Sequence, residues 1–533
     1  MDIQSLDRVI TSRGYAIKKS SLSEAESRQL RKDLTVAPVV AAKFAGGEGN
    51  EFPVFYESPT RIYAPRQWAM KHFGAPEANI VPEGESLNPS LKFTGKPYEY
   101  QTKIIDKFIG AGGNGLICVP CGKGKTFMAL AIAAKLGRRF LIIVDKEFLL
   151  NQWRGEIEAF FPGLKIGILQ GDSTQVGTET ITAKDLTQAE LKQKARDAKL
   201  PVGGNKEDLV KRLKDAGVDI SPKKETVTYD CTICMLQTVV QRTLPDSTFK
   251  SYGFTIFDEC HHLGAAHFSR VLTKVQTKWM LGLSATPKRD DGLTKVFEWF
   301  LGEAVYWEKV REPDATVSVL TLNCSYEDPD YEEVPVDWRG EAVLARLLGK
   351  VVDYRPRTEA IAEIIASWIK ESAERRVLVL SERKSHLETF EGLLSPLGVE
   401  IGYYIGGMKE EDRDKSAASA RVVLATYAMA SEAMNIKTLN AVVLASPRKK
   451  VEQSTGRILR IRPEQRNLEH RILDVIDSHG IYKGQWQKRM SYYKQCQYKI
   501  YQLGQNGDRT EITYKHKAPV QLPEEQGCMI SDD

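Results

Sequence analysis

The chain lacks the long apolar segments that export or membrane insertion would need. Its first residues, MDIQSLDRVITSRGYAIKK, contain no apolar stretch of the ~7–15 residues that a secretory signal carries. No run approaches the ~18–20 apolar residues of a membrane-spanning helix. We therefore expect an intracellular protein that makes no membrane contact.

Cysteine is also scarce, with eight residues scattered over the sequence. A disulfide framework is not expected in a reducing compartment. Two pairs, Cys118/Cys121 and Cys231/Cys234, have a spacing that zinc sites also use. The first pair straddles a candidate phosphate loop, and the second lies in a strand-like run where residues three apart point to opposite faces. We therefore expect no structural zinc.

Neither charge sign is in large excess, because 75 basic side chains face 70 acidic ones and the net charge is +5. This balance permits an anionic partner without requiring one. The composition, 42% hydrophobic and 27% charged, is that of an ordinary folded protein. A chain of 533 residues exceeds the ~250–300 residues that one hydrophobic core supports, so at least two domains are expected.

Strand-like apolar runs alternate with helical patterns from about residue 91 onward, which predicts an α/β fold with parallel sheets covered by helices. The pattern pauses at a polar, acidic stretch around 324–337 and then resumes, so two α/β domains in tandem are expected. The predicted strands are 115–119, 140–144, 165–169, 254–258, 280–284, 376–381, 421–426 and 441–446. The predicted domains are a small N-terminal accessory domain (1–90), a first α/β domain (91–311), a second (312–515) and a flexible tail (516–533).

A lysine-rich segment, residues 174–226, interrupts the first α/β domain. Its apolar residues have the spacing of two short amphipathic helices, with a turn at Pro201, Gly203 and Gly204. They are Leu186, Leu191, Ala195, Leu209, Val210 and Leu213.

The stretch CVPCGKGKT, which follows an apolar run, has the composition of a phosphate-binding loop. Val119 stands where the strict pattern has glycine, but the second half is complete. Gly122 and Gly124 let backbone N–H groups face an anion, Lys125 can reach terminal phosphates, and Thr126 offers a hydroxyl to Mg²⁺.

The run FTIFDECHH places an acidic pair at the carboxyl end of a strand, which is where open α/β sheets bind ligands. Asp258 suits contact with a Mg²⁺ ion that bridges the β- and γ-phosphates of ATP. Glu259 can orient and deprotonate water. A phosphate loop together with this pair predicts nucleotide hydrolysis.

The ordered set of motifs resembles the superfamily 2 helicases over roughly residues 95–480. The resemblance implies two RecA-like domains, ATP and Mg²⁺ as cofactors, and an adenine contact from Gln101 in KPYEYQ. It implies that the LSATP motif couples hydrolysis to movement. It assigns phosphate binding to Gly122, Lys123, Gly124, Lys125 and Thr126, and coupling to His261, Ser284, Thr286 and Glu432.

The same resemblance assigns residues to the polymer and to the second domain. It assigns IVDKEFLLNQW (143–153) and MLQT (235–238) to contacts with the nucleic-acid backbone, the second through Gln237 and Thr238. QSTGRILR supplies Gln453, Arg457 and Arg460, and the two arginines, three apart on an expected helix, would reach the γ-phosphate held by the first domain. Asn435 stands where many members have aspartate, which weakens the coupling role of that motif.

The interrupting segment resembles the SAP motif, a helix-turn-helix unit that binds DNA. This implies that Lys206, Lys211 and Arg212 contact phosphates. The alternative is a helical hairpin that only packs on its host. A second open question concerns the aromatic and basic segment 480–504, which suits base stacking but favours packing against its own domain.

Within the superfamily, VPCGKGKT, DECHHLGAAHFSRVL and LGLSATPKRDDGL are most similar to the DNA-directed branch that includes XPB and phage UvsW. The N-terminal and C-terminal segments resemble helicases of large cytoplasmic DNA viruses related to the poxvirus transcript-release helicase. The expected function is ATP-driven movement along single-stranded, duplex, forked or branched DNA, with 3′-to-5′ polarity. The expected setting is viral transcription or genome maintenance, in host cytoplasm and possibly the virion, with transcription or repair proteins as partners.

Three alternatives remain open. The first is a translocase that remodels duplexes or branches without processive unwinding, and the second is a helicase directed to RNA or RNA–DNA hybrids. The third is a regulatory protein that binds DNA through the SAP-like segment. A degraded Lys125, Asp258 or Arg460 would favour the third, and all three residues are present.

Overall fold

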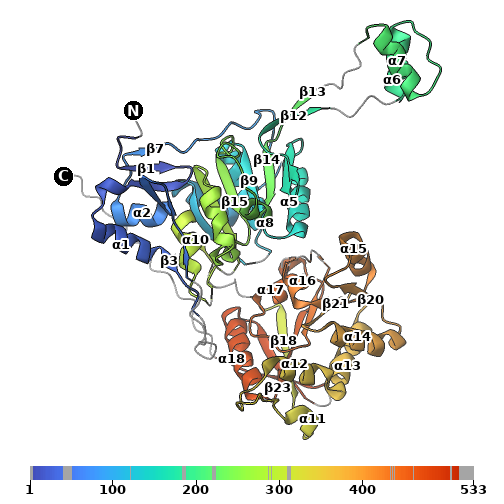
Figure 1. The fold of residues 1–533 in the computed structure, drawn as a ribbon. Coiled ribbons are helices and arrows are strands. Elements are labelled where there is room, and N and C mark those ends of the chain that lie inside the picture. The colour runs from blue at the N-terminus through green and yellow to red at the C-terminus, as the bar shows by residue number, and fades with distance from the viewer. Residues whose placement is uncertain are drawn as a thin grey trace. The chain divides into compact units, whose positions relative to one another are not determined.

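The computed structural model divides into two compact units (Figure 1). The first comprises Met1–Cys118 and Lys125–Trp307, and the second comprises Glu308–Asp533 together with the loop Val119–Gly124. The boundary at Trp307 lies four residues before the predicted one. The structure describes residues 4–39, 51–120, 122–182, 188–218, 224–285, 287–289, 291–308, 314–432, 434, 436, 438–459, 461, 463–504 and 507–514.

An eight-stranded sheet forms the centre of the first unit, in the order β11-β10-β14-β9-β15-β16-β8-β17, and every pair except β10–β11 is parallel. All five predicted strands are present within about two residues of their predicted bounds. The strands are β8 (Asn114–Cys118), β9 (Phe140–Val144), β10 (Ile166–Gln170), β11 (Ser173–Thr174), β14 (Cys231–Met235), β15 (Phe254–Phe257), β16 (Trp279–Ser284) and β17 (Ala304–Trp307).

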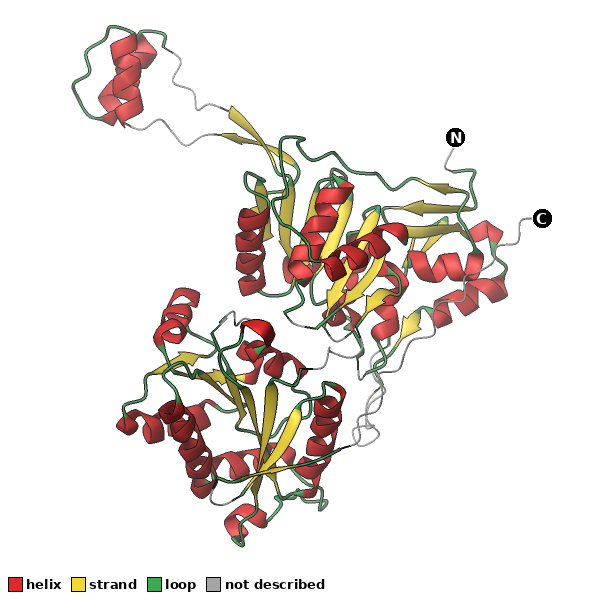
Figure 2. Cartoon of the chain, turned by 180° about the vertical axis from the view of Figure 1, so that it is seen from behind, coloured by secondary structure: helices red, strands yellow, loops and turns green. Residues whose placement is uncertain are grey.

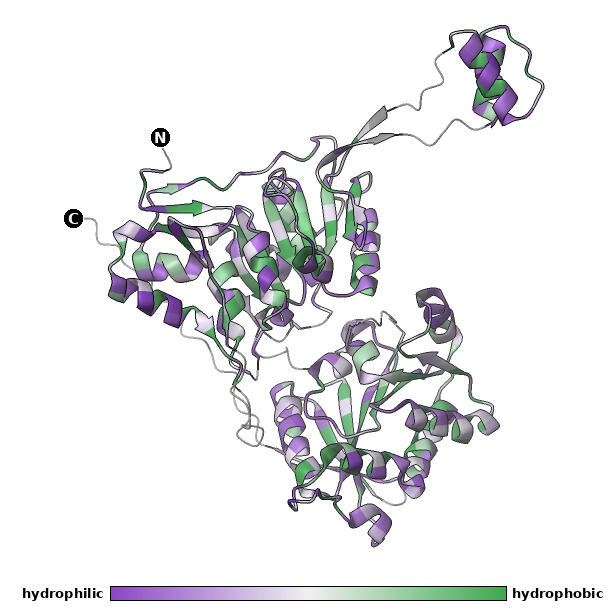
Figure 3. Cartoon of the chain, viewed as in Figure 1, coloured by the Kyte–Doolittle hydropathy of each residue, from purple (hydrophilic) through white to green (hydrophobic). Residues whose placement is uncertain are grey.

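The register of the central strands determines where the site lies. Phe257 is level with Ile143 on one side and Gly282 on the other, and Ser284 is level with Cys118. The segments that follow β8, β9, β15 and β16 therefore leave the sheet at the same edge. The strands are buried on both faces, which explains their continuous apolar sequences (Figure 3).

Helices cover this sheet and position the site segments. Helix α3 (Glu99–Gly110) contacts β8, and α4 (Lys125–Leu136) contacts β15. Helix α5 (Glu147–Phe160) contacts β9 and β14, and α8 (Leu236–Gln241) follows β14 directly. The middle of α4, from Met128 to Ala133, is buried, so the helix that follows the phosphate loop is anchored in the core.

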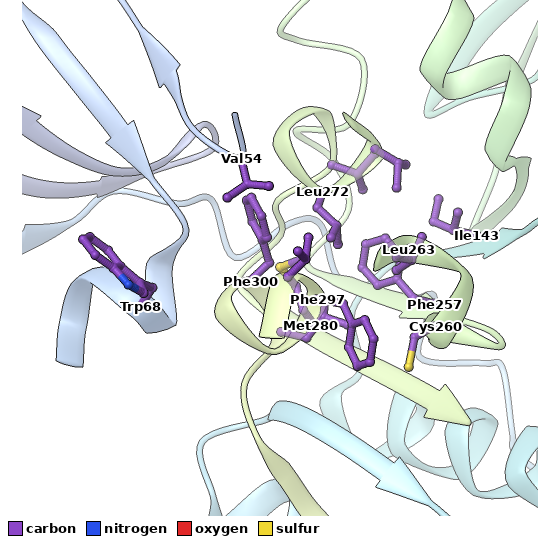
Figure 4. Packing of buried hydrophobic residues seen from close by; sticks show 14 of the residues in the cluster. Val54, Trp68, Ile143, Phe257, Cys260, Leu263, Leu272, Met280, Phe297 and Phe300 are labelled. Atoms are coloured by element: carbon purple, nitrogen blue, oxygen red, sulfur yellow. The ribbon is translucent and has the colours of Figure 1, made fainter. Parts of the chain in front are cut away.

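The N-terminal region forms a five-stranded sheet in the order β5-β6-β2-β1-β7. Its hydrophobic core is continuous with that of the adjoining α/β layer: Val54 and Trp68 belong to one buried cluster with Met280 and Phe300 (Figure 4). Its elements are β1 (Arg8–Thr11), β2 (Gly14–Lys18), α1 (Glu24–Asp33), β3 (Thr35–Val36), β4 (Phe52–Pro53), β5 (Tyr56–Glu57), β6 (Arg61–Ala64), α2 (Arg66–Phe73) and β7 (Ala78–Asn79). This region is therefore an integral layer of the first unit.

The inserted segment contains the two predicted helices, α6 (Gln188–Asp197) and α7 (Lys206–Asp215), beyond a two-stranded ribbon of β12 (Thr178–Thr182) and β13 (Lys224–Thr228) (Figure 2). The helices enclose a small core of their own, and Asn205 caps α7 by accepting from the Asp208 N–H. That core consists of Leu191, Ala195, Leu209 and Leu213, with Val210 half-buried beside it. The predicted core residue Leu186 lies outside the described residues.

The second unit contains another eight-stranded sheet, in the order β20-β21-β19-β22-β23-β18-β24-β25, parallel except for β25. The three predicted strands are present, but the sequence reading had missed β18, β20, β23, β24 and β25. The strands are β18 (Val317–Cys324), β19 (Val377–Ser381), β20 (Ile401–Tyr404), β21 (Val422–Thr426), β22 (Ala441–Leu444), β23 (His470–Asp477), β24 (Lys499–Leu503) and β25 (Arg509–Glu511). The fold class predicted from the sequence, two α/β domains with parallel sheets, is confirmed.

Helices also surround this second sheet. They are α11 (Pro329–Glu332), α12 (Leu344–Asp353), α13 (Arg355–Glu371), α14 (Lys384–Leu394), α15 (Glu410–Ser419), α16 (Tyr427–Glu432), α17 (Glu452–Thr455) and α18 (Gly480–Gln495). The predicted flexible tail, 516–533, lies outside the described residues.

The aromatic segment of α18 packs against its own domain. Tyr482, Tyr493 and Tyr498 are buried. The Tyr493 hydroxyl donates to Asp474 at 2.7 Å, and Arg489 donates to both oxygens of the same carboxylate at 2.8 and 2.7 Å. The packing interpretation of residues 480–504 is confirmed, because the aromatic rings cover a buried ion pair.

Two further observations concern the composition-based expectations. Among the described residues, no helix combines the length and apolar character needed to cross a bilayer. Cys231 and Cys234 are fully buried within β14, and neither forms a disulfide.

Candidate nucleotide-binding site

The phosphate loop follows β8 and leads directly into α4, whose first residue is Lys125. Gly122 and Gly124 have φ angles of 88° and 79°, in the left-handed region that favours glycine. The turn therefore requires the two glycines that the sequence singled out. Thr126, half-buried at the second position of α4, lies where backbone N–H groups have no helical partner.

Two lysines of this loop have acidic neighbours. Lys125 Nζ lies 3.5 Å from Glu259 Oε1, and Lys123 Nζ lies 3.5 Å from Glu308 Oε1. The first contact brings together the phosphate loop and the acidic motif, which are separated by 134 residues in sequence. The structure thus joins the two motifs whose pairing predicted nucleotide hydrolysis.

Asp258 is the first residue after β15, and three hydrogen bonds fix it. Its backbone N–H donates to the Ile143 carbonyl at 3.1 Å. The indole N–H of Trp153 donates to Oδ2 at 2.8 Å, and the Glu259 N–H donates to Oδ1 at 2.9 Å. Burial, and then the neighbouring charge of Glu259, raise the pKa of Asp258 to about 6. The ionised form of this carboxylate is therefore disfavoured, and a bound cation would stabilise it.

Glu259 adopts a left-handed backbone conformation with a φ of 42°. Non-glycine residues rarely occupy this region, and such strain concentrates at functional sites. Burial disfavours the charge of its carboxylate, but Lys125 and His261 outweigh burial and lower the pKa of Glu259. The His261 Nδ1 atom lies 3.3 Å from Glu259 Oε2. Glu259 is therefore held ionised, as a general base must be.

His261 links the acidic motif to the LSATP motif. Its Nδ1 atom lies 3.0 Å from the hydroxyl of Ser284, which is fully buried at the end of β16. Arg289 donates to the His261 carbonyl at 2.5 Å and to Asp291 Oδ1 at 2.9 Å. The structure thus joins the acidic motif to the LSATP motif, and Arg289 is bonded to the first of them; the coupling roles of His261 and Ser284 stay predictions. Thr286 lies outside the described residues.

Gln101 is buried near the start of α3, and its side-chain oxygen accepts from the Tyr98 N–H at 3.0 Å. Tyr98 is 52% exposed and stacks on Tyr100, with ring centroids 6.0 Å apart and planes 16° apart. An aromatic pair with one exposed ring, next to a hydrogen-bonded amide, would suit a planar base. The adenine contact of Gln101 stays a prediction.

Three of the residues predicted to contact the polymer, Gln237, Thr238 and Arg212, have partners within the chain. Gln237 Nε2 donates to the Asp145 carbonyl at 2.6 Å, and the Thr238 hydroxyl accepts from the Gly171 N–H at 3.1 Å. In the insert, Lys206 and Lys211 are exposed on α7. Arg212 instead donates to the carbonyls of Pro201 and Gly203, which closes the turn between the helices.

Of the residues predicted to sense the γ-phosphate, the structure describes Gln453 and Arg457 in the second unit. Gln453 is half-buried on α17, which ends at Thr455. Arg457 lies on the 3₁₀ turn Gly456–Ile458 that follows α17 directly, and its placement on one helix with Arg460 stays a prediction. Glycine at position 456 disfavours helix continuation. Arg457 donates to the Met434 carbonyl at 2.8 Å.

Several of the remaining predicted positions cannot be placed. Arg460 and Asn435 lie outside the described residues, as does the side chain of Glu432.

Sequence reasoning did not predict that Trp153, Asp145 and Arg289 contact the acidic motif. The motif containing Trp153 was assigned to nucleic acid, yet its indole N–H holds the carboxylate of Asp258, 105 residues away. A tryptophan at a helical core position gives no signal of its hydrogen-bond partner. Only the side-by-side placement of β9 and β15 shows the contact.

Comparisons with known proteins agree with this geometry. A family profile described as the res subunit of type III restriction enzymes matches residues 94–289, and the helicase conserved C-terminal domain matches residues 357–462. A putative ATP-dependent RNA helicase of Acanthamoeba polyphaga mimivirus is 28% identical over 507 residues, which cover 92% of this chain and 86% of that protein.

Two further proteins illustrate the range of the likeness. A putative ATP-dependent RNA helicase of African swine fever virus (isolate Pig/Kenya/KEN-50/1950) is 23% identical over 428 residues, or 76% of this chain and 74% of that protein. The crystal structure of T4 UvsW has 16% sequence identity and a TM-score of 0.33, covering 93% of this chain and 99% of that one. With its two helicase domains and this site, the chain is an ATP-dependent helicase of superfamily 2, and thus an ATP hydrolase.

Proposed function

We propose that this helicase hydrolyses MgATP to move along DNA with 3′-to-5′ polarity. The observation that carries the proposal is the convergence of Lys125, Asp258 and Glu259 at one edge of the parallel sheet, where Glu259 lies within ion-pair distance of Lys125 and donates a backbone hydrogen bond to Asp258. The inserted helices provide a separate basic surface for the polymer.

The residues at this edge fit Mg²⁺. Thr126 and Asp258 would hold the ion, and both offer hard oxygen ligands. Among the described residues, no cluster of three or more His, Cys, Asp and Glu side chains could enclose a metal. That suits Mg²⁺, which is held by one or two carboxylates together with the substrate phosphates. When bound, the ion neutralises charge on the β- and γ-phosphates.

Lys125 and Glu259 exchange partners during the proposed cycle. Their 3.5 Å contact satisfies both charges before nucleotide binds. An arriving γ-phosphate competes for the ammonium group of Lys125, which frees the Glu259 carboxylate to take a proton from the attacking water. The hydrogen bond between His261 and Ser284 then connects the base to the LSATP segment.

The second unit completes the proposed mechanism. Gln453, Arg457 and Arg460 would sense and stabilise the γ-phosphate, so that ATP favours closure of the two domains and hydrolysis releases it. Glu432 and Thr286 would contribute to the coupling of this change to movement. The orientation of these residues toward the phosphate is part of the proposal.

The inserted helices support DNA as the polymer. Residues 188–218 contain eight basic and five acidic side chains, and Lys206, Lys211 and Lys214 are exposed on α7. The resemblance to the SAP motif adds to this argument. Lys206, Lys211 and, through its remaining N–H groups, Arg212 would contact phosphates, while Gln237 and Thr238 would border the track on the first unit.

RNA is a second candidate polymer, because the mimivirus and African swine fever virus relatives are both named as putative ATP-dependent RNA helicases. ATPase activity measured with single-stranded DNA, duplex DNA, forked DNA, RNA and RNA–DNA hybrids decides between them. Stronger stimulation by DNA supports the proposal, and stimulation by RNA alone would assign the enzyme to RNA. Failure of every polynucleotide to stimulate hydrolysis would contradict both.

The type of movement needs a separate assay. Strand displacement measures unwinding, whereas triplex displacement measures translocation along an intact duplex. Activity in the second assay alone would identify a remodelling translocase. We place the activity in viral transcription or genome maintenance in the host cytoplasm, since the similar proteins named above are viral.

A further inference from the structure

The loop between β9 and α5 contacts the acidic motif and also Gln237 of α8, which is predicted to contact the polymer. It begins after Val144, and α5 starts at Glu147. Asp145 of this loop and Trp153 of α5 both contact the acidic motif. Neither has a role in the nucleotide chemistry described above.

Trp153 makes the closer contact. Its side chain is almost completely buried, and its indole N–H donates to Asp258 Oδ2 at 2.8 Å. The Glu259 N–H donates to the other oxygen at 2.9 Å. The two donors fix the rotation of the carboxylate, and therefore the direction in which its remaining lone pairs face a cation.

Asp145 makes the second contact and joins it to the predicted polymer surface. Its carboxylate lies 3.6 Å from His262 Nδ1 in the acidic motif. Its backbone carbonyl accepts from Gln237 Nε2 of α8 at 2.6 Å. The connection between β9 and α5 is thus held by α8 on one side and by the acidic motif on the other.

Helix α5 can carry a displacement from this connection to Trp153. Trp153 lies six residues after the start of the helix, which corresponds to about 9 Å along its axis at ~1.5 Å per residue. Leu149, Leu150 and Ile157 bury the same side of the helix, so it moves as a rigid element.

We propose that Trp153 is a positioning residue that aims Asp258 at the metal, and that α5 makes metal affinity respond to polymer bound beside Gln237. The second part rests on the proposed function. The first part rests only on the Mg²⁺ binding at Asp258 that the proposed function includes, and not on any polymer.

The positioning role is tested with Trp153→Phe, which keeps an aromatic ring and removes the N–H donor. Binding of a fluorescent ATP analogue is titrated against Mg²⁺ with no polymer present. We expect the half-saturating Mg²⁺ concentration to rise about tenfold, as the loss of a partner behind a metal ligand typically does. An unchanged Mg²⁺ titration would overturn the proposal.

Trp299→Phe is the matched control. It makes the same substitution in the same unit, at a tryptophan that packs edge-on against Trp68 at 6.4 Å. Thermal unfolding of both variants separates a loss of stability from a loss of metal affinity. A rise in half-saturating Mg²⁺ shared equally by the two variants would also contradict the positioning role.

The coupling is tested by repeating the Mg²⁺ titration with saturating DNA, whose binding is followed separately by anisotropy. In the wild type we expect DNA to lower the half-saturating Mg²⁺ concentration about fivefold or more. In Trp153→Phe, DNA should bind but leave that concentration unchanged. An equal shift in both proteins would overturn the coupling.

Failure of DNA or RNA to bind would count against the proposed function and leave the polymer-free result standing. If Trp153→Phe does not fold, hydrogen exchange of the wild type provides the test. DNA and Mg²⁺–nucleotide should each increase protection in residues 143–160, and a segment unaffected by either would contradict the proposal.

Discussion

At the scale of single residues, the contact between Lys125 and Glu259 predicts a large loss of ATP hydrolysis when the lysine is removed. Lys125→Ala removes the group that binds the terminal phosphates and leaves Glu259 without its main source of stabilisation. We expect ATP hydrolysis to fall at least about 100-fold in steady-state assays, a loss of about 3 kcal/mol or more of transition-state stabilisation. Lys135→Ala is a suitable control, because it removes an exposed lysine paired with Asp106 from the last turn of the same helix.

The basicity of Glu259 leads to a second prediction. Glu259→Gln keeps the size of the side chain but cannot accept a proton from water. We expect the variant to bind a fluorescent ATP analogue with an affinity within a fewfold of the wild type, and to lose turnover about 100-fold or more. Retention of turnover would show that another group acts as the base.

Asp258 gives a pH dependence with a definite sign, because its pKa is raised from 3.8 to about 6. The folded state holds this proton more tightly than the unfolded state. The resulting stabilisation is fully present below pH 3.8 and is lost as the pH rises through about 6. Metal binding responds in the opposite direction, since Mg²⁺ requires the ionised carboxylate.

We therefore expect Mg²⁺-dependent nucleotide binding to weaken about tenfold for each pH unit below 6. Over the same range the free energy of unfolding, measured with urea, should rise as the pH falls when compared with Asp258→Asn. A wild type and Asp258→Asn that show parallel stability profiles from pH 4 to 7 would contradict the raised pKa.

At the scale of elements, the inserted helices can be removed without cutting the sheet. They have their own core, and the ribbon β12–β13 separates them from β11 and β14. Replacing residues 183–223 by a short Gly–Ser linker should weaken DNA binding and flatten its salt dependence, while ATP hydrolysis without DNA stays measurable. Anisotropy titrations at several salt concentrations test this.

Lys206→Glu with Lys211→Glu is the sharper version of this experiment, because both side chains are exposed and the helical core remains intact. If the surface binds phosphates, each lost contact reduces the slope of log K against log salt by about 0.7–0.9. Unchanged DNA affinity would make the insert a spacer or a protein-docking element.

Some strands could be predicted from the sequence and others could not. Runs such as FLIIV and RVVLAT are buried on both faces, so they read as strands without knowledge of the sheet. β18 and β23 were missed although both are buried, because their sequences VSVLTLNC and HRILDVID contain polar residues whose partners lie in other elements. Asp474 and Asp477 are examples, since buried arginines neutralise them.

In the candidate site, too, local signals could be predicted and contacts with distant segments could not. Glycines at positive φ and an acidic pair after a strand carry local signals that could be predicted. The partners of Asp258 depend on contacts between distant segments, so the sequence did not indicate them.

At the scale of the whole molecule, the N-terminal layer shares its hydrophobic core with the first α/β domain. Arg66 is almost fully buried and donates to the carbonyls of Thr277 at 2.7 Å and Lys278 at 3.1 Å, just before β16. Arg66→Met would remove the donor to the Thr277 carbonyl and leave the Lys278 carbonyl with the 3.4 Å bond from Asn114 Nδ2. We expect unfolding of the first unit in urea to require about 2–3 kcal/mol less free energy.

Arg61→Met is a useful comparison, because it removes an arginine of β6 whose guanidinium donates to the Leu6 carbonyl within the N-terminal layer. If residues 1–90 were an independent domain, both variants would melt that layer alone and leave ATP hydrolysis intact. A shared core instead predicts that Arg66→Met lowers the melting temperature and the ATPase activity together.

The last prediction concerns communication between the two units. If Arg460 stabilises charge on the γ-phosphate as the proposed mechanism requires, Arg460→Ala should slow hydrolysis about 10³-fold while nucleotide affinity changes little. Fluorescent labels, one in each unit, should report a distance change on addition of a nonhydrolysable ATP analogue in the wild type and a smaller one in the variant. Arg509→Ala, which removes an arginine paired with Glu469 in the second unit, should leave both signals unchanged. Normal hydrolysis by Arg460→Ala would mean that the first unit assembles the transition state without this arginine, because Lys125, Asp258 and Glu259 all belong to that unit.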